Sequence, residues 1–360
     1  MAMGDVRKCV LSVVSHMSVT LIATAMLVAA GSRAGAAPSL GKTVTIETGT
    51  GEYADCLRKA FYEPFEKATG IKVLTAPEND DDSKFKLAVE THHYRADIEG
   101  VLNSGFAQAP NGPKYLEPID YSVIPRSEII PDLAQTYAVA TDTYAYTLGY
   151  NTQKTGGKVP EGWADFFDLQ KFPGKRGVGD GPTRILIMAL LADGVAPNAI
   201  VPLDFDRAFR KLDTIKSQLV YWETGSQVQD LLTSGEVSLS IVFANRIHSS
   251  RKSGKPVGQV WNGVMIGSDM RAVPKGDPNK ATAMRYLAFV MSKEINGLQT
   301  NCIALGPANI QAKSNPEVAP DLPSSHLNEP HVLLDSPKVT SWLGSYADEI
   351  NNRFQQWKSH

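Results

Sequence analysis

Apolar and polar positions follow two different spacings along the chain, which is typical of a mixed α/β protein. Residues 43–46 alternate as in a strand, whereas the apolar residues of 55–69 recur at helical spacing until Gly70. Residues 72–74 return as a second strand. A strand, a helix and a strand in this order predict a right-handed crossover and a largely parallel sheet. Pro64 falls inside the helix and is expected to kink or divide it.

The same spacings divide the rest of the chain into two lobes. Acidic residues 80–82 precede a helical pattern at 85–89, and residues 97–101 are typical of a strand. The strand-like stretch 144–150 precedes a turn-rich segment, so we take it as the first crossing between lobes and expect the second near Ser268. The predicted fold class is therefore α/β with two lobes. Its segments are lobe 1 at 37–150 and 268–335, lobe 2 at 151–267, and a C-terminal helical segment at 336–360.

The first 36 residues have the pattern of a secretory signal peptide. Arg7 and Lys8 precede an apolar run at 19–30, and Ala34 and Ala36 supply the small residues that signal peptidase recognises. A membrane-spanning helix needs about 20 apolar residues, and this run is shorter. We therefore expect cleavage after Ala36 and a soluble, periplasmic mature protein.

Charge and length narrow the class of protein further. The chain has 36 basic and 38 acidic residues, and removal of positions 1–36 leaves 33 and 37, a net charge of about −4. The basic residues are scattered, so nucleic acid is not an expected partner. A chain of more than 300 residues is too long for one ordinary core, which agrees with two lobes. Cys56 and Cys302 are the only cysteines left after cleavage, and the sequence leaves open whether they form a disulfide.

The chain has none of the motifs that indicate common enzymes. No Gly-x-Ser-x-Gly elbow, His-Glu-x-x-His motif or complete Walker motif Gly-x-x-x-x-Gly-Lys-Ser/Thr occurs. His92 and His93 are adjacent and would point in different directions on a helix, so we interpret them as exposed polar residues. Glycines at 177–181 match part of a dinucleotide fingerprint without its full spacing, and a tight turn before a helix N-terminus explains them equally well. We expect no catalytic residue, no metal and no cofactor.

Several phrases along the mature chain carry a resemblance to a known family. They are YEPFEKATGIKV at 62–73, GWADFFD at 162–168, FPGKR at 172–176, SGEV at 234–237, AVPKG at 272–276 and GPAN at 306–309. Together they resemble the spermidine/putrescine-type periplasmic solute-binding proteins of ABC importers. The resemblance implies a type II periplasmic binding protein, a monomer whose two lobes close on a ligand and deliver it to a membrane permease.

The resemblance also implies ligand-binding residues. In polyamine binders of this family, carboxylates hold the amines and aromatic rings flank the methylene chain. Glu52 and Asp269 match the acidic positions, Tyr53 matches a cleft aromatic residue, and Phe243 stands where a tryptophan usually stands.

Four further positions depart from the polyamine pattern. Thr50 and Gly267 fall where two more cleft tryptophans would be, while Gly181 and Arg184 fall at acidic positions. A buried diammonium ligand needs an anion at each end, because an unpaired buried charge costs several kcal/mol. Arg184 would repel a second ammonium and hold a carboxylate through two parallel hydrogen bonds, and Arg246 is a second candidate for this task.

Several ligand classes therefore stay open. The ligand is a polyamine or an ω-amino acid such as 4-aminobutyrate, and the charge pattern favours the zwitterion. A ferric-ion receptor has the same fold but usually presents adjacent tyrosines, and no Tyr-Tyr pair occurs. A periplasmic enzyme on this scaffold would need a nucleophile with a base, and no matched set is evident.

Overall fold

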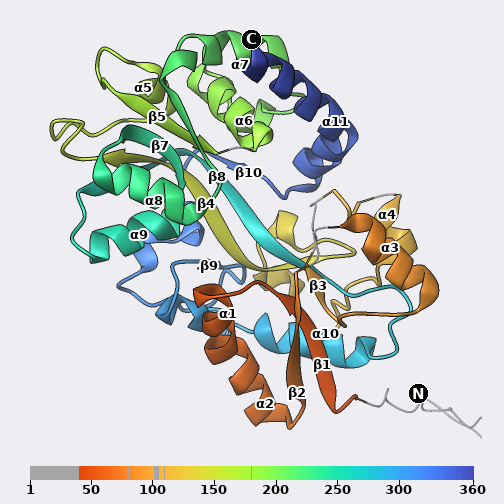
Figure 1. Cartoon of the computed structure of the whole chain (residues 1–360). Coiled ribbons are helices and arrows are strands. Elements are labelled where there is room, and N and C mark those ends of the chain that lie inside the picture. Colours follow the sequence, from red (N-terminus) through yellow and green to blue (C-terminus); the bar gives the residue numbers. More distant parts are fainter. Residues whose placement is uncertain (1–39, 79–80, 101–104, 109, 180) are drawn as a thin grey trace, which may run out of the picture. The chain divides into compact units, whose positions relative to one another are not determined.

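The computed structural model describes residues 40–78, 81–100, 105–108, 110–179 and 181–360 (Figure 1). They belong to one of two units into which the chain divides, Ser39–His360. The other unit, with the predicted signal peptide at 1–36, lies outside the described residues. No helix in the described part combines the length and the apolar character needed to cross a membrane.

The chain opens with the predicted strand, helix and strand. Strand β1 (Thr43–Thr48) pairs in parallel with β2 (Lys72–Pro77). The helix between them is divided into three parts by a π-helical turn, and Pro64 lies near the start of the third part. This division was predicted, because proline lacks the N–H that a continuous helix requires. The three parts are α1 (Glu52–Leu57), the π-helical turn η1 (Arg58–Tyr62) and α2 (Glu63–Thr69).

The next helix and strand agree only partly with the sequence prediction. Helix α3 (Asp82–Thr91) is capped by the Asp81 carboxylate, which accepts hydrogen bonds from the backbone N–H groups of Ser83 and Lys84. Strand β3 (Glu99–Gly100) covers just two positions of the predicted strand at 97–101, and 101–104 lie outside the described residues. A short helix, α4 (Asn111–Tyr115), follows.

A larger sheet of eight strands carries the rest of the fold. Its main path runs in the order β10-β8-β4-β7-β5-β6, with β3 paired to β8 and β9 paired to β4. The strands β4 and β8 are long and antiparallel, whereas β5 pairs in parallel with both β6 and β7. The bounds are β4 (Val139–Asn151), β5 (Lys175–Gly179), β6 (Leu219–Trp222), β7 (Val237–Phe243), β8 (Val257–Ala272), β9 (Gly306–Pro307) and β10 (His331–Leu333).

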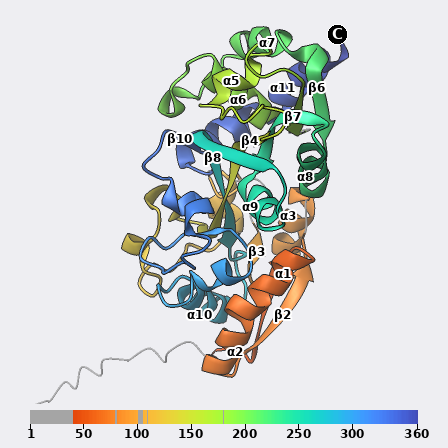
Figure 2. The ribbon, with the colours of Figure 1, turned by 90° about the vertical axis from the view of Figure 1, so that its left-hand side faces the viewer.

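The helices lie at the two ends of β4 and β8. Figures 1 and 2 show α1, α2 and α10 near β1 and β2, and α5, α6 and α7 at the opposite end. Helix α6 begins directly after Gly181, as predicted, but Gly177 and Gly179 belong to strand β5 and not to a loop. The remaining helices are α5 (Trp163–Phe167), α6 (Pro182–Ala192), α7 (Phe205–Asp213), α8 (Gly225–Ser234), α9 (Ala244–Lys252), α10 (Lys280–Val290) and α11 (Pro337–Ser359).

The buried apolar side chains form two large cores, and β4 passes from one to the other. Val139 and Ala140 pack in the first core, with β1, α2 and α10. Tyr146 and Leu148 pack in the second core, with α6, α8 and β7. Strand β8 makes the same passage in reverse, since Met265 belongs to the second core and Met270 to the first.

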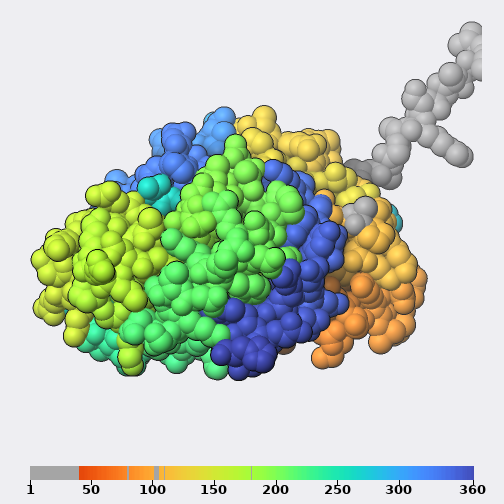
Figure 3. Space-filling model, turned by 90° about the horizontal axis from the view of Figure 1, so that it is seen from above, coloured from red at the N-terminus to blue at the C-terminus, as the bar shows by residue number. Residues whose placement is uncertain are grey.

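The C-terminal helix packs with the second core. Val339, Ile350 and Phe354 of α11 are buried there, and α11 contacts α6. Figure 3 shows this blue helix lying beside the green residues of the second core. From the sequence, we expected the chain to return to the first lobe and 336–360 to form a helical segment apart from both lobes. The apolar stripe on α11 instead completes the second core.

A disulfide joins Cys56 and Cys302, with 5.7 Å between their Cα atoms. The sequence had left this pairing open. The bridge ties helix α1 to the segment that follows the 3₁₀ turn Leu298–Asn301. Two parts of the chain that are 246 positions apart are therefore held together beside the strands that link the cores.

Candidate functional site

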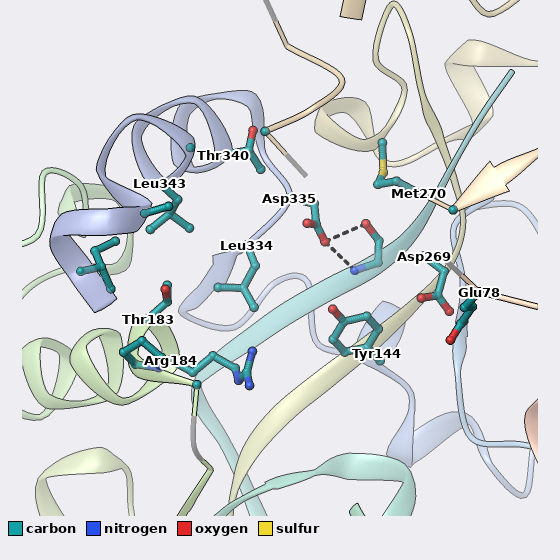
Figure 4. Close-up of a pocket in the computed structure, with 18 of the residues that line it drawn as sticks. Glu78, Tyr144, Thr183, Arg184, Asp269, Met270, Leu334, Asp335, Thr340 and Leu343 are labelled. Carbon is teal, nitrogen blue, oxygen red and sulfur yellow. Dashed lines mark hydrogen bonds between the residues drawn. The ribbon is translucent and has the colours of Figure 1, made fainter. Parts of the chain in front are cut away.

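Two adjoining cavities lie along the strands that link the two cores. Their volumes are about 580 and 740 Å³, and both are lined by Glu78, Tyr144 and Asp269. The first cavity also reaches the start of α6 and the inner face of α11, as Figure 4 shows. The second reaches α1 and the start of α9. The shared lining residues make the two cavities parts of one site.

All six site residues predicted from the sequence line these cavities. Asp269 lines both of them, and Arg184 lines the first. The remaining four, which line the second, are Glu52, Tyr53, Phe243 and Arg246. The structure therefore brings together residues that lie as much as 217 positions apart in the chain, from Glu52 to Asp269.

Asp269 is held by a chain of hydrogen bonds. The Tyr53 hydroxyl donates to Asp269 Oδ2 over 2.8 Å, and Arg271 Nη2 donates to the Tyr53 oxygen over 3.1 Å. Arg271 Nη1 also donates to the backbone carbonyl of Glu47 over 3.0 Å. Burial, with the nearby carboxylates of Asp142 and Asp269, raises the pKa of Tyr53 well above its usual value, so this phenol remains a donor at neutral pH.

A second carboxylate, Asp142, lies directly behind Asp269. It is 0 % exposed, and its Oδ2 is 3.4 Å from the Tyr53 hydroxyl. Burial and the neighbouring Asp269 raise the pKa of Asp142 well above the ordinary carboxyl range, and Arg271 opposes this shift. The centre of the site therefore contains two acidic groups and one guanidinium.

Aromatic rings form the wall between the acidic and basic ends. Tyr146 and Phe243 pack with ring centroids 4.4 Å apart, and Tyr144 meets Tyr146 edge-on at 5.8 Å. Trp222 lies behind Phe243, at 6.2 Å, and is buried. Rings arranged in this way can flank a methylene chain or face an ammonium group.

Arg184 lies over this aromatic wall. Its guanidinium carbon is 4.7 Å from the centroid of Tyr146, and it forms no ion pair with any described residue. Figure 4 shows Arg184 on one side of Tyr144, with Asp269 and Glu78 on the other. A cation and an anion therefore line the same cavity with an aromatic ring between them.

The two glycines at positions that depart from the polyamine pattern make room for Arg184 and Tyr144. A Cβ atom at Gly181 would lie 2.4 Å from Arg184 Nη2, and one at Gly267 would lie 2.4 Å from Cζ of Tyr144. Gly267 is the backbone partner of Tyr144 across the β4 and β8 ladder. A side chain at either position would push the arginine or the tyrosine out of its present place.

Comparison with known proteins shows to which family of proteins this chain belongs. Residues 60–324 match the family model described as "Bacterial extracellular solute-binding protein". The chain belongs to this solute-binding protein family. The match confirms the family that the sequence phrases predicted, and with it the expectation of a receptor of an ABC importer and not an enzyme.

Two curated relatives extend over most of the chain. One is 27% identical over 346 residues, with 90% of this chain and 93% of its own length covered, and is the gamma-aminobutyric acid-binding protein of Pseudomonas aeruginosa. The other is the putrescine-binding periplasmic protein SpuD of Pseudomonas aeruginosa, 25% identical over 291 residues, with 72% of this chain and 77% of its own length covered.

Solved structures confirm the two-lobed fold of periplasmic binding proteins. The structure of a GABA receptor, Atu4243, is 32% identical with a TM-score of 0.77, and the match covers 88% of this chain and 97% of that one. The binding protein AgtB of A. tumefaciens R10, in complex with agropinic acid, is 29% identical with a TM-score of 0.70, and the match covers 88% and 99%.

The floor of the cavity in this solute-binding protein is braced by Asp335. Its Oδ2 accepts hydrogen bonds from the backbone N–H of Ser268, over 2.6 Å, and from the Ser268 hydroxyl, over 2.9 Å. These are the dashed lines of Figure 4. Asp335 follows β10, so the bond fixes the entry to α11 against β8 at the position next to Asp269.

The residues that surround Asp269 were not predicted from the sequence. Asp142, Tyr144 and Tyr146 alternate along β4, and Asp269 and Arg271 alternate along β8. Alternate residues of a strand share one face, so this period-two pattern was a signal for the missed residues. The stretch 144–150 was interpreted only as a crossing strand, and the polar residues on its inner face were not grouped with Asp269.

Proposed function

We propose that this protein is a periplasmic receptor for a zwitterionic ω-amino acid, with 4-aminobutyrate as the reference ligand. One observation carries the proposal: Asp269 and Arg184 line the same cavity, with Tyr144 between them. A ligand with an ammonium group at one end and a carboxylate at the other complements that arrangement. A diamine complements only one end of it.

In this proposal the ammonium group binds to Asp269. The Tyr53 hydroxyl orients the Asp269 carboxylate, and the rings of Tyr144 and Phe243 flank the methylene groups of the ligand. A charge-assisted hydrogen bond in a site shielded from water is among the stronger single contacts available to a small ligand. Glu52, which is exposed at the start of α1, contributes a second negative charge to the cavity wall.

The ligand's carboxylate binds to Arg184 or Arg246. Arg184 shares the first cavity with Asp269, and Arg246 shares the second. Neither guanidinium forms an ion pair with a described residue, so each has hydrogen-bond donors to offer a carboxylate. The relatives named for gamma-aminobutyric acid support this class of ligand.

A polyamine is the second candidate, favoured by the number of acidic groups. Glu52, Glu78, Asp142 and Asp269 all lie in or directly beside the two cavities, and the relative SpuD is named for putrescine. Arg184 and Arg246 speak against it, because either would have to leave the cavity or repel the second ammonium.

Binding is expected to close the two lobes. We propose that β4 and β8 are the crossings, that the backbone change falls near 141–145 and 266–269, and that α11 moves with the second lobe. The closed receptor, a monomer, would deliver the solute to the membrane permease of its importer. Nucleic acid has no place in this proposal.

A thermal-shift screen of the mature protein tests the function. Ligands are 4-aminobutyrate, 5-aminovalerate, putrescine, spermidine, an opine and ferric ion. Ligand at 100 times its Kd stabilises the folded state by about 2.7 kcal/mol, which is a readily measured rise in Tm. We expect the ω-amino acids to give the largest rise. A response to ferric ion or to polyamines alone would refute the proposed ligand class.

A further inference from the structure

The two central carboxylates come from neighbouring strands and share one hydrogen-bond donor. Asp142 lies on β4 and Asp269 on β8, at an irregularity in the ladder between the pairs Ala140 with Met270 and Thr143 with Ser268. The Tyr53 hydroxyl is 2.8 Å from Asp269 Oδ2 and 3.4 Å from Asp142 Oδ2. The two side chains therefore face each other across the paired strands.

The charges around Asp142 do not balance if both carboxyl groups are ionised. The groups that face it are Tyr53 from α1, Tyr62 from η1, and Asp269 and Arg271 from β8. Tyr53 and Tyr62 are buried phenols whose pKa is raised by burial, so both are neutral at pH 7. Arg271 is then the only cation among these groups and is opposed to two carboxylates. Arg271 and Asp142 are buried, whereas Asp269 is partly exposed to the cavities. An unbalanced negative charge centred on the fully buried Asp142 costs several kcal/mol, so we expect the pair to retain one proton.

We propose that Asp142 and Asp269 share one proton in the ligand-free receptor, and that the ligand's ammonium group replaces it, so that binding releases one proton. This inference rests on the proposed function. The ammonium keeps its own protons and supplies the positive charge that the shared proton supplied before. The O–H bond of the carboxyl pair breaks, and the proton passes to the buffer.

Two further facts agree with this exchange. Burial and Asp269 both raise the pKa of Asp142, which is the shift that a shared proton requires. Asp269 alone of the two carboxylates lines the cavities, so an ammonium can reach the pair from that side without reaching Asp142. Asp142 is therefore a positioning residue that acts through Asp269.

The exchange fixes the sign of the pH dependence. Because binding releases a proton, a higher pH favours binding. Where one full proton is released, the affinity rises about tenfold for each pH unit, and it levels off above the apparent pKa of the free pair. A receptor whose site does not titrate would show no such slope.

Calorimetry with 4-aminobutyrate measures the released proton directly. Titrations at pH 7 in phosphate, HEPES and Tris give apparent enthalpies whose slope against the buffer's ionisation enthalpy equals minus the number of protons released, because the buffer takes those protons up. We expect about one proton for the wild type and about none for Asp142→Asn, since asparagine can donate to Asp269 without a titrating proton.

Two variants serve as matched controls. Asp277 is a buried carboxyl outside the cavities whose pKa is raised to about 6 by burial, and Glu99 is a buried carboxyl whose pKa is raised to about 9 by burial and by Glu47. Asp277→Asn and Glu99→Gln should both keep the release of one proton. Loss of the release in either control would assign the proton to that group and overturn the inference.

The remaining outcomes separate this inference from the proposed function. Binding of 4-aminobutyrate without a buffer dependence, or a release that persists in Asp142→Asn, overturns the shared proton and leaves the function standing. If only putrescine binds, the proposed ligand is wrong, and the same buffer series with putrescine measures whether binding releases a proton. If neither ligand binds, infrared spectra of the ligand-free protein at pH 7 test whether the carboxyl pair holds a proton. The wild type should show the stretch of a protonated carboxyl that Asp142→Asn lacks, and identical spectra would refute the shared proton.

Discussion

Gly181 and Arg184 occupy their present places together, because a Cβ atom at Gly181 would lie 2.4 Å from Arg184 Nη2. Both residues depart from the acidic pattern expected of a polyamine binder. The two departures are structurally linked. Because Gly181 has no side chain, the Arg184 guanidinium has room beside it. Arg184 then lies over the ring of Tyr146, facing the cavity that Asp269 also lines.

Gly181→Ala should weaken the binding of 4-aminobutyrate without unfolding the protein. The clash is with the far end of a flexible arginine, so the side chain can move aside at little cost to stability. Calorimetry should show a weaker Kd for the variant and an unchanged Tm for the ligand-free protein. In an Arg184→Ala background the glycine substitution should add nothing. An additive loss in the double variant would show that Gly181 acts independently of Arg184.

Removing both candidate arginines should separate the two ligand classes. Arg184→Ala with Arg246→Ala removes the carboxylate partners, and truncating a buried charged partner costs about 2 to 5 kcal/mol, or roughly thirtyfold to several thousandfold in affinity. The affinity for 4-aminobutyrate should fall by that factor. The affinity for putrescine should stay the same or improve, because a like charge has been removed. Equal losses for both ligands would indicate general damage to the cleft.

The sequence predicted the class of fold and named six residues that line the cavities, but it did not predict the shape of the site. Asp269 and Arg184 could be named because matched family phrases fix their positions. Asp142 was not named, because it lines neither cavity and because its alternation with Tyr144 does not by itself show that β4 pairs with β8 beside Asp269. The place of α11 was also missed, since an amphipathic helix at a chain end shows that it packs somewhere but not against which core.

Loss of the disulfide should lower stability more than it alters the site. Cys56→Ser with Cys302→Ser opens a loop of 246 positions, for which the chain-entropy model gives about 5 kcal/mol of lost stability. Urea unfolding of the oxidised wild type and the double variant measures the difference. A variant with the same midpoint as the wild type would show that the bridge does not constrain the unfolded chain.

Glu99 should make the protein less stable as the pH rises. Its pKa is about 9 in the folded protein, because of burial and Glu47, against an ordinary value of 4.5. The folded state therefore holds a proton that the unfolded state loses, and stability falls between about pH 4.5 and 9. Glu99→Gln removes this titration, so its unfolding free energy should vary less over that range. Parallel pH profiles for the variant and the wild type would contradict the assignment.

Calorimetric titration of the mature protein, wild type and Asp269→Asn, with 4-aminobutyrate and with putrescine decides whether the cleft is a receptor site for a zwitterion. The wild type should have one saturable site that prefers 4-aminobutyrate to putrescine. Asp269→Asn should weaken binding by about thirtyfold or more, through loss of the ammonium's partner. Tight binding of putrescine by the wild type, with no response to 4-aminobutyrate, would contradict it and return the site to the polyamine class.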